Sequence, residues 1–574
     1  MPLLRRARAA AIGTALLATG LAMNPLAHAD QGPGCAPAGP TLRYLVVFTV
    51  GTSSEDAQAQ ITSACGTTTI YYSQIAVAVA TSADPGFGER LGPDRVYSAQ
   101  AQAYFDGDQR PDGSRKADEL PVDPIRGGTP DPDTVSADDR TGQQWDMSMI
   151  KAPQAHKINE GSSRVLVGVL DSGIDPGHPN LAKELDQQAS AGCVTGKPDT
   201  SEAAWAPSTS SHGTHVAGTI AAADDGSGVA GVAPGVRVAS VKVVDDAGYI
   251  YPEAAVCGFM WAAQQGMTIA NNSYFVDPWV FTCNDSQGQN VIYTAVERAV
   301  SYATAHGVLS VAAAGNGDVD LTNPGLDSQS PDNVDPGDQE QRQLGMDCVQ
   351  LPAGIPGVVT VSAIGGAGVK AGYSSYGLGA ISLTAPGGDP RQRTTGGPRC
   401  VLSTVPGGYA SSCGTSMAAP HVSGVAALLA STHPNATPKQ LAKLLNADAD
   451  PIACPADYDL NGTGTQDAYC TGDTSFNSFY GHGMVDALAA VSGSTDTPAP
   501  STQAAAAPVV TNPPPPVPDQ GVPANTSTTH QATTTPRKTD TVVPPPAPVT
   551  VPPAPPVLTP AGGPIGGFAL LGTW

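Results

Sequence analysis

Between Gln144 and Val491 the chain alternates short, almost uninterrupted apolar runs with longer helix-like stretches. The runs are rich in Val, Ala and Ile and have the length of strands: Val165–Leu170, Val238–Val244, Met267–Ala270, Val308–Ala314 and Val358–Ala363. Helix-like stretches separate several of them: Thr214–Ala223, Ala254–Gln265 and Val291–Ala305. This alternation predicts an α/β fold with a doubly wound, mostly parallel sheet that carries helices on both faces.

Polar residues follow three of these runs at the point where each run ends. Asp171 follows the first run, Asn271 to Ser273 follow the third, and Asn316 follows the fourth. In open parallel sheets the functional residues gather at the carboxyl ends of the strands. We therefore expect these side chains to converge on one rim of the sheet and to form a site there.

A later stretch, Gly414 to Gly424 and on to Ala430, predicts a helix made of small and apolar residues. A helix without a polar face belongs inside a domain rather than on its surface. Ser416 would lie at its N-terminus, where backbone N–H groups and the helix dipole favour developing negative charge. Pro420 agrees with this placement, because proline is tolerated only near the start of a helix. A serine alone indicates no more than a hydrogen-bonding side chain, so its role depends on its partners.

The first 29 residues have the pattern of a secretory signal peptide. Arg5, Arg6 and Arg8 form a basic region, Ala9–Met23 is apolar, and Ala27-His-Ala29 is a small-x-small cleavage site. A transmembrane anchor is the alternative, but the apolar run is short and rich in Ala and Gly. We therefore expect a secreted protein. The net charge of −23 and the pI near 4.6 argue against nucleic acid or an anionic membrane surface as a partner.

Outside the cytoplasm, disulfides are the default interpretation of the ten cysteines, which form no CxxC cluster. Cys35 can pair with Cys65, and short loops favour two further bridges, Cys400 with Cys413 and Cys454 with Cys470. The pairing of four cysteines stays open: Cys193, Cys257, Cys283 and Cys348.

Two further regions flank the central one. Residues 42–103 read as a small α+β unit, with strands expected near Leu42–Thr49, within Thr67–Ala80 and at Asp94–Ser98, and a helix at Glu55–Ala64. Asp106–Arg140 is rich in Asp, Pro and Gly and predicts an exposed, cleavable connector. From Ser494 onward the chain is Pro-rich and predicts an extended tail whose apolar end is too short to span a bilayer.

Three segments occur together in the central region: Asp171-Ser-Gly-Ile-Asp-Pro-Gly-His-Pro, His212-Gly-Thr-His-Val-Ala-Gly-Thr219 and Gly414-Thr-Ser-Met-Ala-Ala-Pro420. With these the chain resembles the subtilisin-like serine peptidases, or subtilases, from about Gln144 to Val491. Further matching segments are Ile150–Pro153, Val229–Pro234, Ala313–Asn316, Pro356–Ala363, Tyr373–Gly377 and Tyr480–Val485. Three long signatures in the order Asp, His, Ser are specific to this family.

The resemblance implies a serine endopeptidase that acts on protein or peptide substrates. Ser416 would be the nucleophile, His212 the general base and Asp171 the carboxylate that orients the imidazole, with His215 as a structural neighbour. Asn316 matches the family's side-chain donor to the oxyanion, together with the backbone N–H of Ser416. No cofactor is expected for catalysis.

The same resemblance implies a zymogen that processes itself. The unit at 42–103 looks like the family's inhibitory propeptide, a ferredoxin-like domain that occupies the cleft as an intramolecular inhibitor until it is cut. The expected organisation is a signal peptide (1–29), an inhibitory propeptide (30–107), a cleavable acidic linker (108–143), a subtilisin-like peptidase domain (144–492) and a Pro-rich disordered tail (493–574).

Structural calcium is a second implication of the resemblance. Asn180 and Asp225, with Gln143 or Gln144, fall near positions that hold calcium in many subtilases. Separately, Asp457–Gly462 has the opening of a calcium loop, but Ala468 stands where such a loop has its bidentate Glu. Solvated loops are an equally good interpretation of both segments.

The chain departs from the family at Tyr274-Phe275, where many subtilases have a small Leu-Gly pair at the edge that binds the substrate backbone. This departure leaves the preferred substrate side chains open. It also keeps two alternatives in view: a processing protease dedicated to one partner, and a catalytically silent binding protein that uses the same fold.

Overall fold

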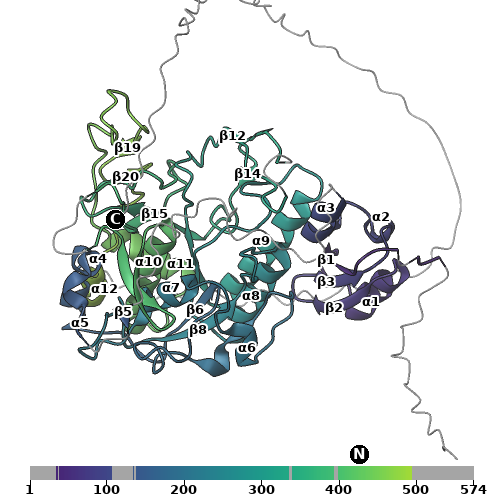
Figure 1. Ribbon diagram of the computed structural model, residues 1–574, viewed down its shortest axis with the longest axis horizontal. Helices are drawn as coiled ribbons and strands as arrows, with labels where there is room; N and C mark the ends of the chain where they lie inside the picture. Colours follow the sequence, from purple (N-terminus) through teal and green to yellow (C-terminus); the bar gives the residue numbers. More distant parts are fainter. Residues whose placement is uncertain are drawn as a thin grey trace, which may run out of the picture. The chain divides into compact units, whose positions relative to one another are not determined.

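A seven-stranded sheet lies at the centre of this computed structural model (Figure 1). The structure describes residues 34–36, 38–105, 133–134, 138–334, 339–392 and 398–493, all within one compact unit. The expected signal peptide, most of the linker and the Pro-rich tail from residue 494 onward lie outside the described residues.

The strand order of the central sheet is β16-β15-β11-β9-β6-β8-β7. Every neighbouring pair in it is parallel. Its members are β6 (Leu166–Asp171), β7 (Ala191–Gly192), β8 (Arg237–Lys242), β9 (Ile269–Asn272), β11 (Leu309–Ala313), β15 (Val359–Ile364) and β16 (Leu383–Pro386). The chain adds strands on one side of β6 and then crosses to the other side with β9, so the sheet is doubly wound, as predicted from the apolar runs.

Helices cover both faces of this sheet because each strand buries side chains on both of its sides. Along β6, Val167 and Val169 belong to one apolar cluster, and Leu166 and Leu170 belong to another. The first cluster contains residues of α7 (His212–Ala221), α10 (Thr415–Thr432), α11 (Pro438–Asp448) and α12 (Ala487–Ser492). The second contains residues of α8 (Pro252–Gln264) and α9 (Gln289–Ala305).

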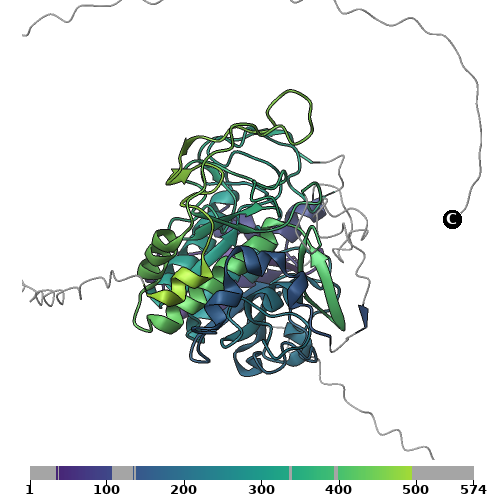
Figure 2. The same cartoon turned by 90° about the vertical axis from the view of Figure 1, so that its left-hand side faces the viewer.

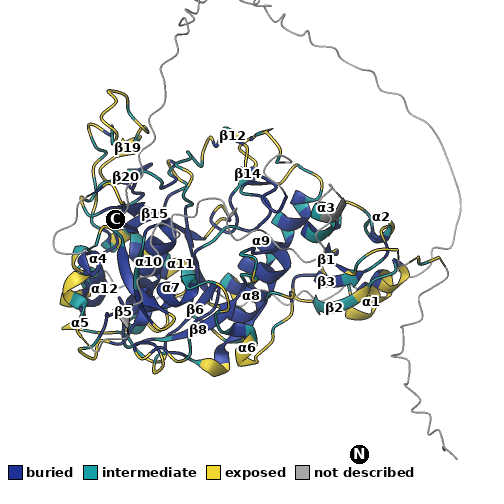
Figure 3. Ribbon diagram, viewed as in Figure 1, coloured by how far each residue is buried: buried dark blue, intermediate teal, exposed yellow. Residues whose placement is uncertain are grey.

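The burial pattern follows these layers. In Figure 3 the sheet and the sheet-facing helices are buried, whereas the exposed residues concentrate in loops and outer helix faces. Figure 2 looks onto the side that carries α11, α12 and the short helix α5 (Ala152–His156). Short elements complete this part: α4 (Trp145–Met149), α6 (Glu202–Trp205), η2 (Thr141–Gln143), η3 (Gln187–Ala189), β10 (Thr282–Cys283), β12 (Leu326–Asp327), β13 (Arg342–Gln343), β14 (Cys348–Val349), β19 (Gly472–Asp473) and β20 (Phe476–Asn477).

The N-terminal unit has its own four-stranded antiparallel sheet, in the order β2-β3-β1-β4. Its elements run β1 (Leu42–Val47), α1 (Ser54–Ser63), β2 (Thr67–Tyr72), β3 (Val77–Ser82), α2 (Phe87–Leu91), β4 (Val96–Tyr97) and α3 (Ala99–Phe105). This βαββαβ connectivity is that of a ferredoxin-like unit. Helix α1 begins after Ser53, whose side chain accepts a hydrogen bond from the N–H of Asp56 and so caps the helix.

One side of the small sheet is buried against α8 and α9. Apolar side chains of β1 and β3, among them Leu45 and Val79, share a cluster with those two helices. Arg298 of α9 donates from Nη1 to the carbonyl oxygens of Phe48 (2.9 Å) and Ile75 (3.1 Å). These contacts join the N-terminal unit to the central one with both apolar burial and charge-assisted hydrogen bonds.

The ten cysteines form five disulfides, and none of them is free. The bridges are Cys35–Cys65, Cys193–Cys257, Cys283–Cys348, Cys400–Cys413 and Cys454–Cys470. Three of these pairs are those expected from the sequence, and the structure pairs the four cysteines that the sequence left open.

A small antiparallel sheet lies beside the last cysteine before Ser416. Strands β17 (Val401–Val405) and β18 (Gly408–Ser412) form a hairpin, and β5 (Asp133–Thr134) pairs with β18. This attaches two residues of the expected linker to the central unit. Among the described residues, no helix combines the length and the apolar character needed to cross a membrane.

Candidate active site

Asp171 and His212 are in direct contact at the end of β6. Asp171 is the last residue of that strand and is 1% exposed. Its Oδ1 accepts hydrogen bonds from Nδ1–H of His212 and from the N–H of Ser172, both at 2.7 Å. A carboxylate in this position holds the imidazole in the tautomer that carries its proton on Nδ1 and leaves Nε2 as the basic nitrogen.

Two glycines allow this approach. A Cβ on Gly213 would lie 2.5 Å from the carbonyl oxygen of Gly173, so only glycine lets the first turn of α7 come this close to the end of β6. Gly173 has φ of +107°, a conformation that other residues rarely adopt. Ser172 completes the junction, because its Oγ accepts a hydrogen bond from the N–H of Gly213 (3.0 Å).

Ser416 is the second residue of α10, the helix that runs through the core. Residues 415–430 of this helix are all buried, as its lack of a polar face predicted. Ser416 is 6% exposed, and its Oγ donates to the carbonyl oxygen of Ser273 (3.2 Å). In return Oγ of Ser273 donates to the carbonyl oxygen of Ser416 (2.9 Å). These two hydrogen bonds attach the helix N-terminus to the end of β9.

Asn316 follows β11 and is held by the residue before Ser416. Its Oδ1 accepts two hydrogen bonds from Thr415, one from the N–H and one from Oγ1, both at 2.9 Å. Among the described residues, no acceptor pairs with its Nδ2. The amide therefore presents a spare donor close to the N-terminus of α10.

The strand register explains why these residues lie on one rim. Leu170 is level with Asn272 in the parallel pair β6–β9, so Asp171 and Ser273 emerge at the same edge. The structure thus joins Asp171 to His212 directly, Ser416 to the end of β9, and Asn316 to Ser416 through Thr415. The sequence did not indicate the contacts of Ser273 and Thr415, since hydroxyl residues are common and their partners lie 143 and 99 residues away in the chain.

The neighbouring histidines are placed differently. His215 is 1% exposed, and its Nε2 donates to the carbonyl oxygens of Val401 and Ala410, both at 3.1 Å. Burial, together with the nearby His212, lowers the pKa of His215 to about 4, so its imidazole is neutral at ordinary pH. His421 contacts a carboxylate, Asp146 (3.1 Å), but both side chains are fully buried. Of these imidazoles, only His212 lies at the rim.

The Tyr274-Phe275 edge follows Ser273 directly. The hydroxyl of Tyr274 donates to Oδ1 of Asn272 (3.1 Å), so the ring folds back toward the end of the sheet. Burial raises the pKa of Tyr274, and the charge of Asp171 raises it further. Tyr274 and Phe275 are both half-buried, and Tyr274 packs against the apolar cluster that contains α8 and α9.

The segment expected to hold calcium near Asn180 is occupied by the protein's own hydrogen bonds. Nδ2 of Asn180 donates to the carbonyl oxygens of Ser227 (3.0 Å) and Ala223 (3.4 Å). Its Oδ1 accepts from the N–H of Val229 (3.4 Å) and from the hydroxyl of Tyr409. A cation needs oxygen ligands, but here an N–H₂ group faces the carbonyl oxygens. These residues do not fit a calcium ion.

The other expected ligands are also engaged. Gln144 exchanges both side-chain hydrogen bonds with the backbone of Ala230 (2.9 Å each), and Asp225 pairs with Ser227 and Lys183. In the loop that begins at Asp457, the carboxylates accept from N–H groups of the same loop. Among the described residues, the groups with metal-binding geometry consist of disulfide cysteines with one carboxylate each.

Comparison with known proteins matches the part of the chain that contains Asp171, His212 and Ser416. The model of the subtilase family matches residues 162–483. The subtilisin of Bacillus pumilus is 34% identical over 306 residues, which are 53% of this chain and 90% of that protein. Fervidolysin of Fervidobacterium pennivorans is 32% identical over 349 residues, which are 56% of this chain and only 42% of fervidolysin. The chain therefore spans less than half the length of that relative.

Two solved structures are similar in fold. The crystal structure of fervidolysin from Fervidobacterium pennivorans, a keratinolytic enzyme related to subtilisin, has a TM-score of 0.52 and 25% identity, over 80% of this chain and 62% of that one. The epidermin leader peptide processing serine protease of Staphylococcus aureus has a TM-score of 0.56 and 19% identity, over 79% of this chain and 98% of that one. At this identity the second likeness concerns the fold alone.

Proposed function

This chain belongs to the subtilase family, and we propose that it hydrolyses peptide bonds with Asp171, His212 and Ser416 as a catalytic triad. The observation that carries the proposal is the 2.7 Å hydrogen bond between Asp171 and His212, at the end of β6, on the rim of the sheet where α10 begins and Ser416 is its second residue. An imidazole at such a rim, with its Nδ1 proton held by a carboxylate and Nε2 as its basic nitrogen, is the base that a serine hydroxyl needs.

The reaction then has two halves. In the first, Nε2 of His212 takes the proton of the Ser416 hydroxyl while Oγ bonds to the substrate carbonyl carbon. The imidazolium, stabilised by Asp171, gives this proton to the leaving amine as the peptide bond breaks. In the second half, water gives a proton to His212, attacks the acyl-enzyme and releases the carboxylic acid, and the proton returns to Ser416.

Asn316 would stabilise the oxyanion that forms in each half. Its orientation supports this role, since Thr415 occupies Oδ1 and leaves the donor end of the amide to the site. The backbone N–H of Ser416 would be the second donor. Donors that are fixed in advance stabilise developing charge without reorganising during the reaction.

We further propose that the protein is exported and made as a zymogen. Residues 1–29 would direct secretion, and the unit at 42–105 would be the intramolecular inhibitor. Two contacts of this unit with the central one support the proposal: Asn333 donates from Nδ2 to the carbonyl oxygen of Ala99 (3.1 Å), and Trp279 donates to the hydroxyl of Tyr97 (3.1 Å). Cleavage between residues 108 and 143 would release the mature enzyme.

The decisive experiment compares Ser416→Ala with Ser431→Ala, a control at the opposite end of the same helix. Mass spectrometry of the secreted proteins gives their termini, and a peptide substrate gives their activity. We expect Ser416→Ala to keep the N-terminal unit and to lose hydrolysis, and Ser431→Ala to mature and to cleave normally. A Ser416→Ala protein that matures alone would refute self-processing, and one that cleaves peptides would refute the triad.

Substrate range is a separate question that Tyr274 and Phe275 raise. An aromatic edge next to the nucleophile favours some side chains over others, so a processing protease for one partner is the second candidate. Digestion of a broad peptide library distinguishes the two. Cleavage confined to one sequence motif would support the dedicated enzyme, and cleavage at many sites would support a general protease.

A further inference from the structure

Lys370 is a lysine with no exposed side chain, located just after β15. Its ammonium group has three N–H donors, and each has an acceptor: Oδ1 of Asp318 (2.7 Å) and the carbonyl oxygens of Ser374 (2.6 Å) and Ala371 (3.3 Å). A buried charge is tolerated only when it is paired in this way. All three donors are thus satisfied within the protein.

Three aromatic rings surround the same ammonium group. Its Nζ lies 5.0 Å from the ring centroid of Tyr376, 5.1 Å from that of Tyr458 and 5.3 Å from that of Phe479. Cation–π contacts of this kind stabilise a desolvated cation. Tyr458 also donates its hydroxyl to the carbonyl oxygen of Lys370 (3.1 Å). The three rings and the carboxylate of Asp318 thus contact the same ammonium group.

Asp318 lies two residues after Asn316, on the loop that follows β11. It has φ of +52°, in the left-handed region that non-glycine residues rarely adopt. Its N–H donates to the carbonyl oxygen of Tyr373 (2.8 Å), and the N–H of Ser375 donates to the carbonyl oxygen of Gly315 (3.0 Å). The loop that carries Asn316 is therefore fixed from one side by the segment after Lys370, and the ion pair is its side-chain anchor.

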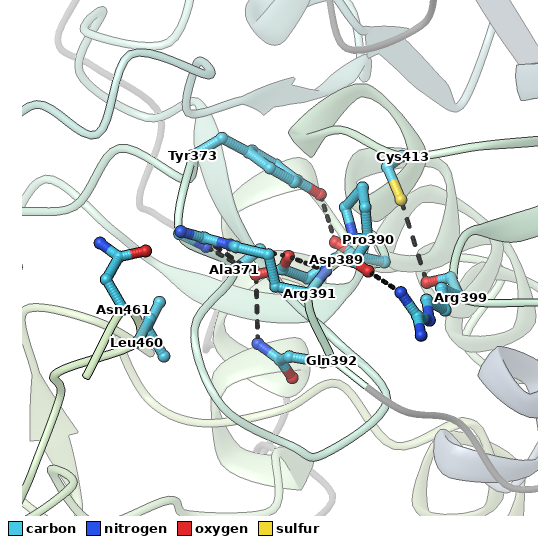
Figure 4. Close-up of polar contacts among 12 residues, drawn as sticks. Ala371, Tyr373, Asp389, Pro390, Arg391, Gln392, Arg399, Cys413, Leu460 and Asn461 are labelled. Atoms are coloured by element: carbon cyan, nitrogen blue, oxygen red, sulfur yellow. Dashed lines mark hydrogen bonds and ion pairs between the residues drawn. The ribbon is translucent and has the colours of Figure 1, made fainter. Parts of the chain in front are cut away.

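A second loop, which carries Asp389, forms hydrogen bonds with this segment; Figure 4 shows Tyr373 and Asp389 within these contacts. Asp389 accepts from the N–H of Gly372 (2.9 Å) and pairs with Arg391, while the hydroxyl of Tyr373 donates to the carbonyl oxygen of Gly388 (2.6 Å). Gly387, the residue before Gly388, accepts a hydrogen bond at its carbonyl oxygen from the N–H of Gly414 (3.0 Å). The segment after Lys370 is thus connected to both loops that meet at Ser416.

We propose that Lys370 is a positioning residue for the oxyanion donor: through Asp318 it holds the amide of Asn316 where the developing oxyanion will lie. This rests on the proposed function. Thr415 orients the amide from one end, and the Lys370–Asp318 pair fixes the loop at the other. Misplacing such a donor by about 1 Å costs up to roughly 100-fold in rate.

The test is a double-mutant cycle on the mature protein, produced from the full-length chain. Lys370→Met and Asp318→Asn are each made with Asn316 present and with Asn316→Ala, and kcat and KM are measured for one peptide substrate. With Asn316 present we expect kcat to fall about 10-fold and KM to change less than about twofold. In the Asn316→Ala background neither substitution should lower kcat further, because the donor that they position is already gone.

Lys151→Met is the matched control, because Lys151 also pairs with two carboxylates, Asp450 and Asp486, and neither lies on the loop that carries Asn316. It should leave kcat unchanged. Equal losses of kcat with and without Asn316, a change in KM alone, or wild-type kinetics would overturn the proposal. If Lys370→Met does not fold, Asp318→Asn decides, since the Asp318 side chain is one-third exposed. Wild-type kcat for Asn316→Ala itself would instead refute the oxyanion role under the proposed function.

Discussion

Two asparagines in loops near the ends of strands, Asn316 and Asn180, behave in opposite ways. Asn316 has Oδ1 fixed by Thr415 and, among the described residues, no acceptor for Nδ2. Asn180 is 1% exposed, and both ends of its amide are paired, Nδ2 with two carbonyl oxygens and Oδ1 with an N–H and the hydroxyl of Tyr409.

This difference distinguishes an amide that can donate a hydrogen bond to a substrate from one that only stabilises the fold. A polar group that is kept without a partner costs stability, so a half-paired amide at the rim indicates a partner that arrives with the substrate. A fully paired amide has nothing left to offer a ligand. Both residues are asparagines in a loop that follows a strand of the central sheet, so hydrogen-bond pairing is the useful criterion.

The largest expected effect is on catalysis. Asn316→Ala should lower kcat by roughly 10²–10³, which corresponds to about 3–4 kcal/mol of transition-state stabilisation, because one oxyanion donor is lost. KM should change little, and the thermal midpoint should fall only modestly, because the N–H and Oγ1 of Thr415 lose the acceptor Oδ1. Steady-state kinetics and a melting curve measure both. A large loss of stability with unchanged kcat would reverse the comparison.

Acid should lower the free energy of unfolding through two buried histidines, His215 and His178. His215 lies behind the rim with a pKa of about 4, and burial also lowers the pKa of His178, whose Nδ1 accepts from the N–H of Asn180 (3.2 Å). Because these folded-state pKa values lie below the unfolded value near 6.5, the unfolded chain binds more protons. The free energy of unfolding should therefore fall as pH drops from about 6.5 toward about 4, by about 3 kcal/mol for His215 alone.

Urea unfolding at several pH values measures this slope. His178→Gln should reduce it, because glutamine keeps a donor and an acceptor but does not titrate. A free energy of unfolding that is constant across this pH range would contradict the neutral state assigned to both imidazoles.

Asn180→Ala should reduce the free energy of unfolding by about 2 kcal/mol, since the carbonyl oxygens of Ala223 and Ser227 and the hydroxyl of Tyr409 lose a buried partner. The value of kcat should stay at that of the native protein. Urea unfolding and peptide hydrolysis on the same preparation test both parts. A fall in kcat without loss of stability would show that Asn180 acts in catalysis rather than in supporting the fold.

The smallest effect concerns calcium. Chelation should leave the melting temperature of the native protein unchanged, because Nδ2 of Asn180 faces the oxygens that a cation would need. Asn180→Asp replaces this donor by a carboxylate oxygen, so the variant should be less stable and should gain stability when calcium is added. A native protein that melts earlier in chelator would show that a calcium ion binds after all.

Much of the central fold was predictable because a parallel sheet buried on both faces requires uninterrupted apolar runs. The run Val165–Leu170 is β6 (Leu166–Asp171), and the stretch Val291–Ala305 is α9 (Gln289–Ala305). The β17–β18 hairpin and α3 were not predicted. Neither carries a long apolar repeat. The hairpin is positioned by its side chains Val401, Leu402 and Tyr409, which pack into apolar clusters formed with other elements.

The candidate site was also predictable in one part and not in another. Its residues, Asp171, His212, Asn316 and Ser416, were nominated from motifs and strand ends, since their chemistry is local to short segments. The role of Lys370 was not visible, because its partner Asp318 lies 52 residues away and its aromatic cage comes from three separate segments.

By itself the sequence determined the family, the parallel α/β sheet and the residue types that the chemistry requires, because periodicity and motifs are properties of neighbouring residues. Only the tertiary structure decided which polar groups are paired. That is why Asn180 is a structural amide, Asn316 has a spare donor and the charge of Lys370 is paired with that of Asp318. Pairing depends on distances between atoms far apart in the chain, and folding alone sets those distances.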